Sequence, residues 1–155
     1  QGFKQFLKTL AGGRITIGAL GLGTAQGAFL KALDYSQERE AFGSAINKFQ
    51  GVSFKLADMA TQIEAARHLV YHAAWKKDQN LVFAKEASMA KLFSSETAMN
   101  VTTEAIQVLG GFGYIKEYDV ERFFRDAKIL EIGEGTSEVQ RMIISRELIK
   151  SVQNI

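Results

Sequence analysis

Glu134 is the residue whose surroundings in this sequence best suit acid–base chemistry. It stands between Gly133 and Gly135, directly after an apolar run and directly before a predicted helix start. Bare backbone on both sides would let a substrate approach the carboxylate closely. Desolvation in an apolar pocket would raise its proton affinity, whereas a helix N-terminus would lower it, and proton abstraction at neutral pH requires the first effect to dominate. The simpler local interpretation is an acidic residue that only complements a helix dipole.

Two other segments could meet a phosphate or a nucleotide. Gly110, Gly111 and Gly113 follow a predicted helix, and bare backbone there would bring amide groups close to a phosphate. The segment does not follow a strand, so it does not match the dinucleotide-binding fingerprint, and a glycine-rich helix C-terminus is the simpler interpretation. Residues 39–43 combine Arg39, an aromatic residue and a glycine at another helix end, which by itself is also an ordinary C-terminus.

The composition excludes several other kinds of site. The absence of cysteine excludes disulfides, thiolate nucleophiles and cysteine-ligated zinc. His68 and His72 share a helix face, but no HExxH pattern surrounds them, so we expect exposed histidines and no metal site. Nineteen Lys and Arg against seventeen Asp and Glu leave a net charge of +2, which is too balanced for electrostatic binding of nucleic acid. Arg125 and Asp126 are expected to form a structural ion pair.

The longest uncharged stretch does not suit a membrane. Sixteen uncharged residues separate Arg14 from Lys31, but they include threonine, glutamine and four glycines. A transmembrane helix needs about twenty predominantly apolar residues. No signal peptide is recognisable in residues 1–10. We therefore expect no membrane partner, and a soluble, cytoplasmic protein.

Helices must position these residues, because proline is absent and glycine is confined to parts of the chain. Residues 52–109 contain neither, which predicts two helices with a break at residues 76–80. Helical spacing predicts a buried stripe in the first of them: Leu56, Met59, Ile63, Ala66, Val70 and Ala73. It predicts a weaker stripe in the second: Met89, Leu92, Glu96, Met99, Thr103 and Ile106.

A further helix is predicted at each end of the chain. The first runs from near Gly12 to about Arg39, and its small residues Ala19, Gly23 and Gly27 form a bare face for close packing or a subunit contact. The last begins near Ser137, which has capping-box spacing to Gln140, and carries Val139, Met142, Ile143, Arg146 and Ile149. A loop at residues 110–114 and a short charged and aromatic segment at 121–126 precede it. Four long helices predict an all-α, up-and-down four-helix bundle.

In this order, the segments resemble the C-terminal domain of the acyl-CoA dehydrogenases, flavoenzymes of fatty-acid and amino-acid breakdown. The resemblance covers nearly the entire chain, through residues 12–14, 39–43, Gln50, 107–114, 125–126, 134–141 and 146–148. In that family a glutamate takes the α-proton of an acyl-CoA thioester while the β-hydrogen leaves as hydride to FAD. The resemblance implies that Glu134 is this base, because it occupies the glutamate of the family's Glu-Gly-Thr motif. The isovaleryl type places the base beside the arginine of the first helix, where this chain has Gly13.

The resemblance also implies the binding residues. Arg39 and Gln50 would contact the FAD of a neighbouring subunit, and so would the loop formed by Gln107, Val108, Leu109, Gly110 and Gly111. Beside the base, the residues implied at FAD are Thr136, Ser137 and Glu138. Arg14 and Gly135 match positions near the acyl-CoA, whereas Ala11 replaces an aspartate of many relatives.

The resemblance further implies that residues 11–155 form this helical bundle and that residues 1–10 are a tail from a missing preceding domain. The chain would then bind FAD weakly by itself and show little activity. It would act in a homo-oligomer, on an acyl-CoA of unknown chain length, with an electron-transferring flavoprotein as acceptor. Two alternatives stay open: a non-catalytic helical oligomerisation or interaction module, and a related acyl-CoA oxidase.

Overall fold

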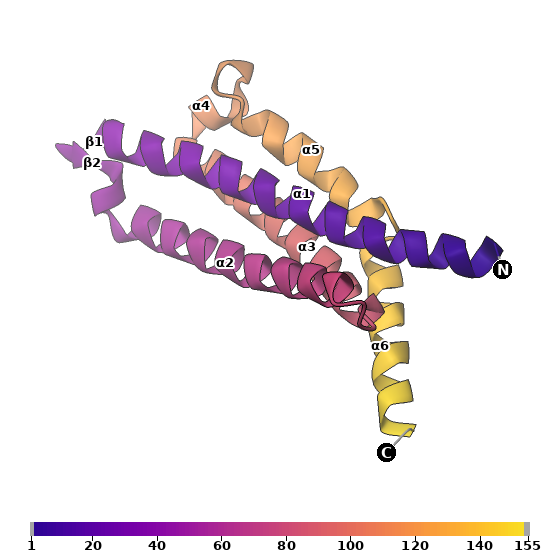
Figure 1. The fold of residues 1–155 in the computed structure, drawn as a ribbon. Coiled ribbons are helices and arrows are strands. Elements are labelled where there is room, and N and C mark those ends of the chain that lie inside the picture. Colours follow the sequence, from indigo (N-terminus) through magenta and orange to yellow (C-terminus); the bar gives the residue numbers. More distant parts are fainter. Residues whose placement is uncertain (1, 154–155) are drawn as a thin grey trace.

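Four helices run alternately up and down the molecule (Figure 1). They are α1 (Gly2–Glu38), α2 (Gln50–Asp78), α3 (Ala84–Leu109) and α5 (Val120–Ile132). The antiparallel strands β1 (Glu40–Ala41) and β2 (Ser44–Ala45) close one end of the bundle, and α6 (Ser137–Gln153) follows α5. The short elements are α4 (Gly111–Tyr114) and two 3-10 helices, Ile46–Lys48 and Lys116–Tyr118. The computed structural model describes residues 2–153, and over this range the predicted all-α, up-and-down four-helix bundle is confirmed.

The first helix is longer than predicted. It begins at Gly2, ten residues before the predicted start near Gly12. Residue 1 of the predicted incoming tail lies outside the described residues. At its other end, α1 leads into the hairpin, whose turn is formed by Phe42 (φ 52°) and Gly43 (φ 78°). Glycine suits this left-handed backbone because it has no side chain to clash with the following carbonyl.

Helices α1 and α3 form the centre of the bundle, with α2 on one side and α5 on the other (Figure 1). Glycine permits their close approach. A Cβ at Gly21 would lie 2.9 Å from the backbone oxygen of Ser94, and a Cβ at Gly18 would lie 3.4 Å from that of Ala90. The backbones of the two central helices therefore touch directly.

The small residues predicted to make this contact lie elsewhere on α1, so that prediction is wrong within the chain. Ala19 is exposed, and a Cβ at Gly23 would meet nothing within 4 Å. Gly27 faces the ring of Phe123, a side chain of α5 and not a backbone. The spacing of four residues between Ala19, Gly23 and Gly27 shows that they share one helix face. It does not predict which neighbour that face contacts.

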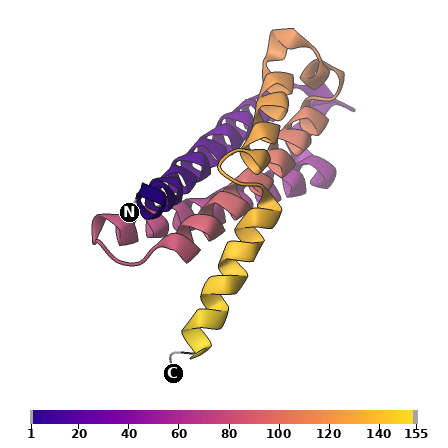
Figure 2. The ribbon, with the colours of Figure 1, turned by 90° about the vertical axis from the view of Figure 1, so that its right-hand side faces the viewer.

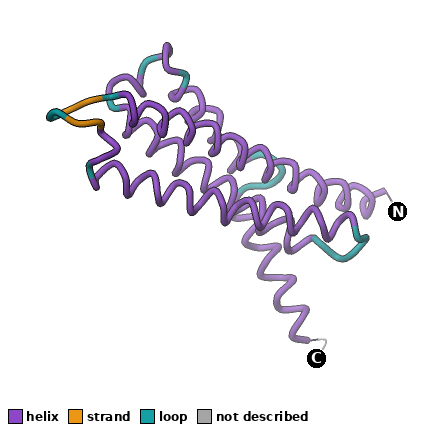
Figure 3. Tube along the Cα trace, turned by 60° about the vertical axis from the view of Figure 1, so that its left-hand side comes forward, coloured by secondary structure: helices purple, strands orange, loops and turns teal. Residues whose placement is uncertain are grey.

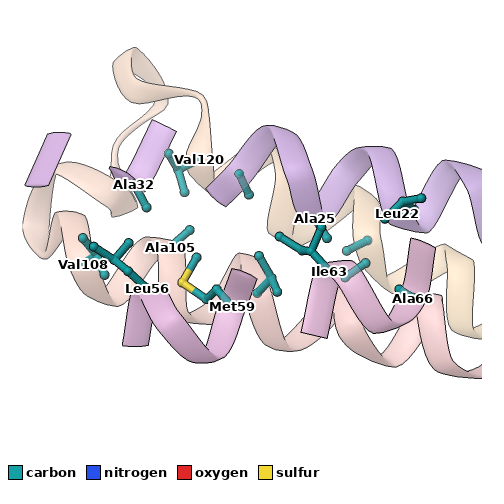
Figure 4. Packing of buried hydrophobic residues seen from close by; sticks show 14 of the residues in the cluster. Leu22, Ala25, Ala32, Leu56, Met59, Ile63, Ala66, Ala105, Val108 and Val120 are labelled. Atoms are coloured by element: carbon teal, nitrogen blue, oxygen red, sulfur yellow. The ribbon is translucent and has the colours of Figure 1, made fainter. Parts of the chain in front are cut away.

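The stripe predicted for α2 is confirmed. All six of its residues are buried, and they are the buried residues of this helix: Leu56, Met59, Ile63, Ala66, Val70 and Ala73. Figure 4 shows Met59 and Ile63 among the small side chains of α1 and α3, including Ala25 and Ala105. A helix on one side of a bundle has a single buried face, so its apolar period predicts that face directly.

The stripe predicted for α3 is wrong. Its six residues are half-buried or exposed. The buried residues of the helix include many small ones: Ala87, Ser88, Ala90, Ser94, Ser95, Ala98 and Ala105. Because α3 touches α1, α2, α5 and α6, small side chains are what let four neighbours approach it. Large apolar residues are then a poor guide to the buried face.

Helix α5 was predicted only as a short charged and aromatic segment. It begins after Asp119, which has a left-handed backbone (φ 60°), and buries Ala127 and Leu130 against the core. The ion pair predicted within this segment is wrong in its partner. Arg125 binds Glu121 one helical turn earlier, with Nε 2.6 Å from Oε2, and not Asp126.

The last helix leaves the bundle. Figures 2 and 3 show α6 projecting from the other helices toward the C-terminus. Apart from its first turns against α3, its apolar side chains stay open to solvent, and Met142, Ile149 and Val152 are exposed. The stripe predicted for this helix is therefore not a buried face in this chain. Among the described residues, no helix has the length and apolar character needed to cross a membrane.

Candidate active site

The turn between α5 and α6 fixes the backbone of Glu134. Glu134 has a left-handed conformation (φ 57°), and so does Gly135 (φ 96°). A residue other than glycine loses about 1–2 kcal/mol in this conformation. Gln140, fully buried on α6, stabilises the turn by donating from Nε2 to the backbone oxygens of Glu134 (3.2 Å) and Gly135 (2.8 Å). Contacts from another element thus hold a strained turn in place.

Thr136 caps the following helix. Its Oγ1 accepts a hydrogen bond from the backbone N–H three residues later, at 3.4 Å. The predicted capping box of Ser137 and Gln140 is wrong, because Ser137 is already the first helical residue and Gln140 binds the preceding turn. A hydrogen bond from Thr136 also lowers the pKa of Glu138. The three residues predicted beside the glutamate therefore do lie next to it.

Gly13 on α1 faces the Glu134 carboxylate. A Cβ at Gly13 would lie 3.0 Å from both Cδ and Oε2 of Glu134, which is tighter than ordinary van der Waals contact. Glycine therefore leaves this space to the carboxylate. In the family resemblance, Gly13 and Glu134 occupy the two alternative positions of the base. In the structure, both positions line the same groove.

The carboxylate lies at a groove that is open to solvent. The groove has a volume of about 1100 Å³ and is lined by α1, the α2–α3 connection and Glu134. Its walls include Leu10, Ala11, Leu81, Val82 and Phe83. Glu134 itself is exposed, so the expectation of a carboxylate closed off from water is not met within this chain.

Arg14 does not line this groove and is almost fully buried, with 8% of its surface exposed. Burial lowers the pKa of Arg14, and the charge of Glu134 opposes that shift. Its Nε has no hydrogen-bond partner among the described residues. A buried donor without a partner is costly, and here it belongs to a residue predicted to lie near the substrate.

Lys91 is a charged residue of this site that the sequence analysis missed. It is fully buried in the first third of α3, and its Nζ donates to the backbone oxygen of Glu131 at 3.0 Å. Glu131 belongs to the last turn of α5, three residues before Glu134. The available signal was a single lysine within the uncharged run of residues 87–95.

A second cavity lies at the hairpin end of the bundle. It has a volume of about 510 Å³ and brings Arg39 together with four other predicted FAD residues, Val108, Leu109, Gly110 and Gly111. A Cβ at either glycine would meet nothing within 4 Å, so the backbone there is open to a ligand.

The remaining predicted FAD residues are not all in this cavity. Gln50 and Gln107 are exposed near the same end of the bundle but do not line it. Glu134 lies far away: from Lys91, which binds the last turn of α5 three residues before Glu134, to Leu109, α3 alone covers about 27 Å at 1.5 Å per residue. The structure therefore separates the predicted cofactor residues into two groups. Each group lies at a different end of the bundle.

The histidines take no part in either group. His68 and His72 are exposed on α2, as predicted. Within residues 2–153, no three His, Cys, Asp or Glu side chains lie close enough together to hold a metal ion.

Residues 1–149 match the family model for the acyl-CoA dehydrogenase C-terminal domain. The chain belongs to the acyl-CoA dehydrogenase family. It is 58% identical to a probable acyl-CoA dehydrogenase of Bacillus subtilis over 150 residues, which are 97% of this chain and 40% of that protein. The resemblance inferred from the residue segments is thereby confirmed.

Two solved structures are similar to this chain. Butyryl-CoA dehydrogenase from Megasphaera elsdenii has a TM-score of 0.94 and 53% identity, over 96% of this chain and 39% of that one. A structure of PigA with FAD and proline has a TM-score of 0.90 and 32% identity, over 92% of this chain and 37% of that one. The chain thus spans about 40% of the length of the relatives it matches.

Proposed function

We propose that this chain supplies the C-terminal domain of an FAD-dependent acyl-CoA dehydrogenase, with Glu134 as the base that takes the α-proton of the thioester. The observation that carries the proposal is the space that Gly13 leaves for the Glu134 carboxylate at the groove, with the charge of buried Arg14 interacting with that of Glu134. Both features support a base at the glutamate of the family's Glu-Gly-Thr motif.

Each residue has a part in moving one proton. Glu134 accepts it, and the fixed turn beneath sets the direction of its carboxylate. Gly13 leaves the carboxylate room to face a substrate in the groove. Arg14 is a buried cation whose charge interacts with the charge of Glu134.

The exposure of Glu134 sets a condition on this proposal. A base works best when water is excluded from the reacting atoms, and the groove of this chain is open. Since the relatives are longer, we propose that other segments of the complete dehydrogenase cover the groove. Residues 1–10 would connect this bundle to those segments.

The cavity at the hairpin end fits part of FAD. Arg39 offers a guanidinium, and Gly110 and Gly111 offer open backbone, which together suit a pyrophosphate. When bound, FAD would supply the acceptor of the β-hydrogen. Because the two groups of predicted cofactor residues lie at opposite ends of the bundle, we propose that the cavity serves the FAD of a second subunit. Gln50 and Gln107 would contact it from outside the cavity.

The central test is Glu134→Gln in the complete dehydrogenase. Glutamine keeps the size of the side chain but cannot take the proton, so we expect the rate at which an acyl-CoA bleaches the flavin to fall by at least about 10³-fold. Binding of the acyl-CoA, measured by titration, should persist. Bleaching at the rate of the unchanged protein would eliminate Glu134 as the base. Loss of binding as well as bleaching would point to misfolding.

The same bleaching assay, applied to the unchanged protein, addresses the alternatives. A non-catalytic interaction module would show no bleaching even with Glu134 present. An acyl-CoA oxidase would also bleach, but air would then reoxidise its flavin rapidly without an added acceptor. An electron-transferring flavoprotein as the acceptor, like the cytoplasmic location, stays a prediction.

A further inference from the structure

A buried cation outside the predicted site connects the centre of the bundle to the turn that carries Glu134. Lys91 has no exposed surface, although lysine is almost never fully buried in proteins. The last carbonyl groups of an α-helix have no N–H of the helix to accept from. The Glu131 oxygen is one of these, and the Lys91 ammonium donates to it at 3.0 Å. Lys91 thus binds the end of α5 where the chain enters the turn.

The charges around Lys91 come from three other helices and from α3 itself. Burial lowers the pKa of Lys91, while the carboxylates of Glu131, Glu138 and Glu96 favour its charged form and Arg14 opposes it. Glu131 lies on α5 and Arg14 on α1, so the ammonium sits where those helices converge on α3. A charge in such a place is usually costly, and a well-packed apolar residue of the same size is often as stabilising or more so.

The turn is therefore held at both ends. Lys91 binds the last turn of α5 from α3, and Gln140 binds the Glu134 and Gly135 backbone oxygens from α6. The two residues that Gln140 binds are the ones in left-handed conformation. Packing alone would not require a lysine there, because buried Ala127 and Leu130 already fill the contact of α5 with the core.

We infer that Lys91 is a positioning residue for Glu134: its hydrogen bond to the end of α5 fixes the turn from which the carboxylate reaches the groove. The inference rests on the proposed function, since it assigns to Lys91 an effect on proton abstraction. A shift of about 1 Å in a reacting group can slow a reaction about 100-fold. A hydrogen bond that only held the bundle together would instead affect stability.

The test is Lys91→Met in the complete dehydrogenase, because methionine keeps the length of the side chain and removes the donor. Three quantities are measured: thermal stability, hydrogen exchange of peptides covering residues 130–137, and the rate of flavin bleaching with its KM. We expect unchanged or higher stability, faster exchange in these peptides alone, and bleaching slowed about 10- to 100-fold at nearly constant KM.

Met59→Ala is the matched control. It opens a cavity on the α2 side of the core, far from the turn, and should lower stability without slowing bleaching at a temperature where the protein is folded. Unchanged exchange in residues 130–137 would overturn the inference, whatever the activity. So would faster exchange with an unchanged rate, an equal loss of rate in Met59→Ala, or a Lys91→Met protein that does not fold.

Glu134→Gln in the same assay separates this inference from the proposed function. If Glu134→Gln is inactive and Lys91→Met retains the full rate, only the role of Lys91 is lost. If both variants retain the full rate, Glu134 is not the base, and the proposed function fails with it.

Discussion

The space between Gly13 and Glu134 is small enough for one methyl group to matter. In the structure a Cβ at Gly13 would lie 3.0 Å from the carboxylate carbon, whereas a Cβ at Gly12 would lie 3.4 Å from the nearest atom, Nζ of Lys77. The carboxylate is the end of a flexible side chain, so it can move aside without disturbing the bundle. The consequence of crowding should therefore be kinetic.

For Gly13→Ala we expect flavin bleaching by an acyl-CoA to slow about tenfold, because the base moves by a few tenths of an ångström. The thermal midpoint should not fall, because alanine has the higher helix propensity and the carboxylate can move aside. Gly12→Ala, one residue away on the same helix, is the control and should keep the full rate. Equal rates for the two variants would contradict the role assigned to the space at Gly13.

The arrangement of the helices depends on which glycines of α1 face another backbone. Gly21 and Gly23 lie on the same helix two residues apart, yet a Cβ at Gly21 would lie 2.9 Å from the Ser94 oxygen and a Cβ at Gly23 would meet nothing within 4 Å. The same substitution should therefore have opposite effects at the two positions.

Gly21→Ala should lower the free energy of unfolding by about 1–2 kcal/mol, because the clash with backbone outweighs the gain in helix propensity. Gly23→Ala should raise it by up to about 1 kcal/mol through helix propensity alone. Denaturant unfolding of the 155-residue chain, followed by circular dichroism, measures both. Destabilisation of similar size at both positions would mean that α1 and α3 do not approach as described.

Comparison of the elements shows what the sequence could predict. The buried face of α2 followed from its apolar period because that helix contacts the bundle on one face. The same reasoning failed for α3, where alanine and serine face four neighbours. It also missed α5, whose charged and aromatic residues hide a short buried face at Ala127 and Leu130.

The residues of the site also differ in how far local sequence could predict them. Glu134 could be predicted because its glycine neighbours are adjacent in sequence, and the resemblance then supplied the motif. Lys91 and Gln140 could not, because each acts on the turn from another helix. Local sequence also could not predict that the groove is open to solvent, because this exposure depends on what surrounds the bundle.

At the scale of the whole molecule, neither end of the bundle forms a closed cofactor site. The cavity beside Arg39 and the turn beside Glu134 are separated by most of the length of α3. One chain thus offers two partial sites, which agrees with the proposal that a second subunit and further segments complete them.

The 155-residue chain alone should therefore bind FAD weakly, with a Kd in the micromolar range or above. Titration of the purified chain with FAD, followed by quenching of flavin fluorescence, measures this. Circular dichroism of the same sample verifies that the chain is helical, so that weak binding is not the result of unfolding. Tight binding of one FAD per chain would show that a single bundle suffices.

The left-handed backbone at Glu134 also bears on attempts to make this protein more heat-resistant. Glycine is the residue that this conformation prefers, so a screen that rewards only survival on heating would favour Glu134→Gly. The selected protein would melt at a higher temperature and would have lost the carboxylate that we propose as the base. Engineering of this domain should therefore select for turnover and thermal tolerance together.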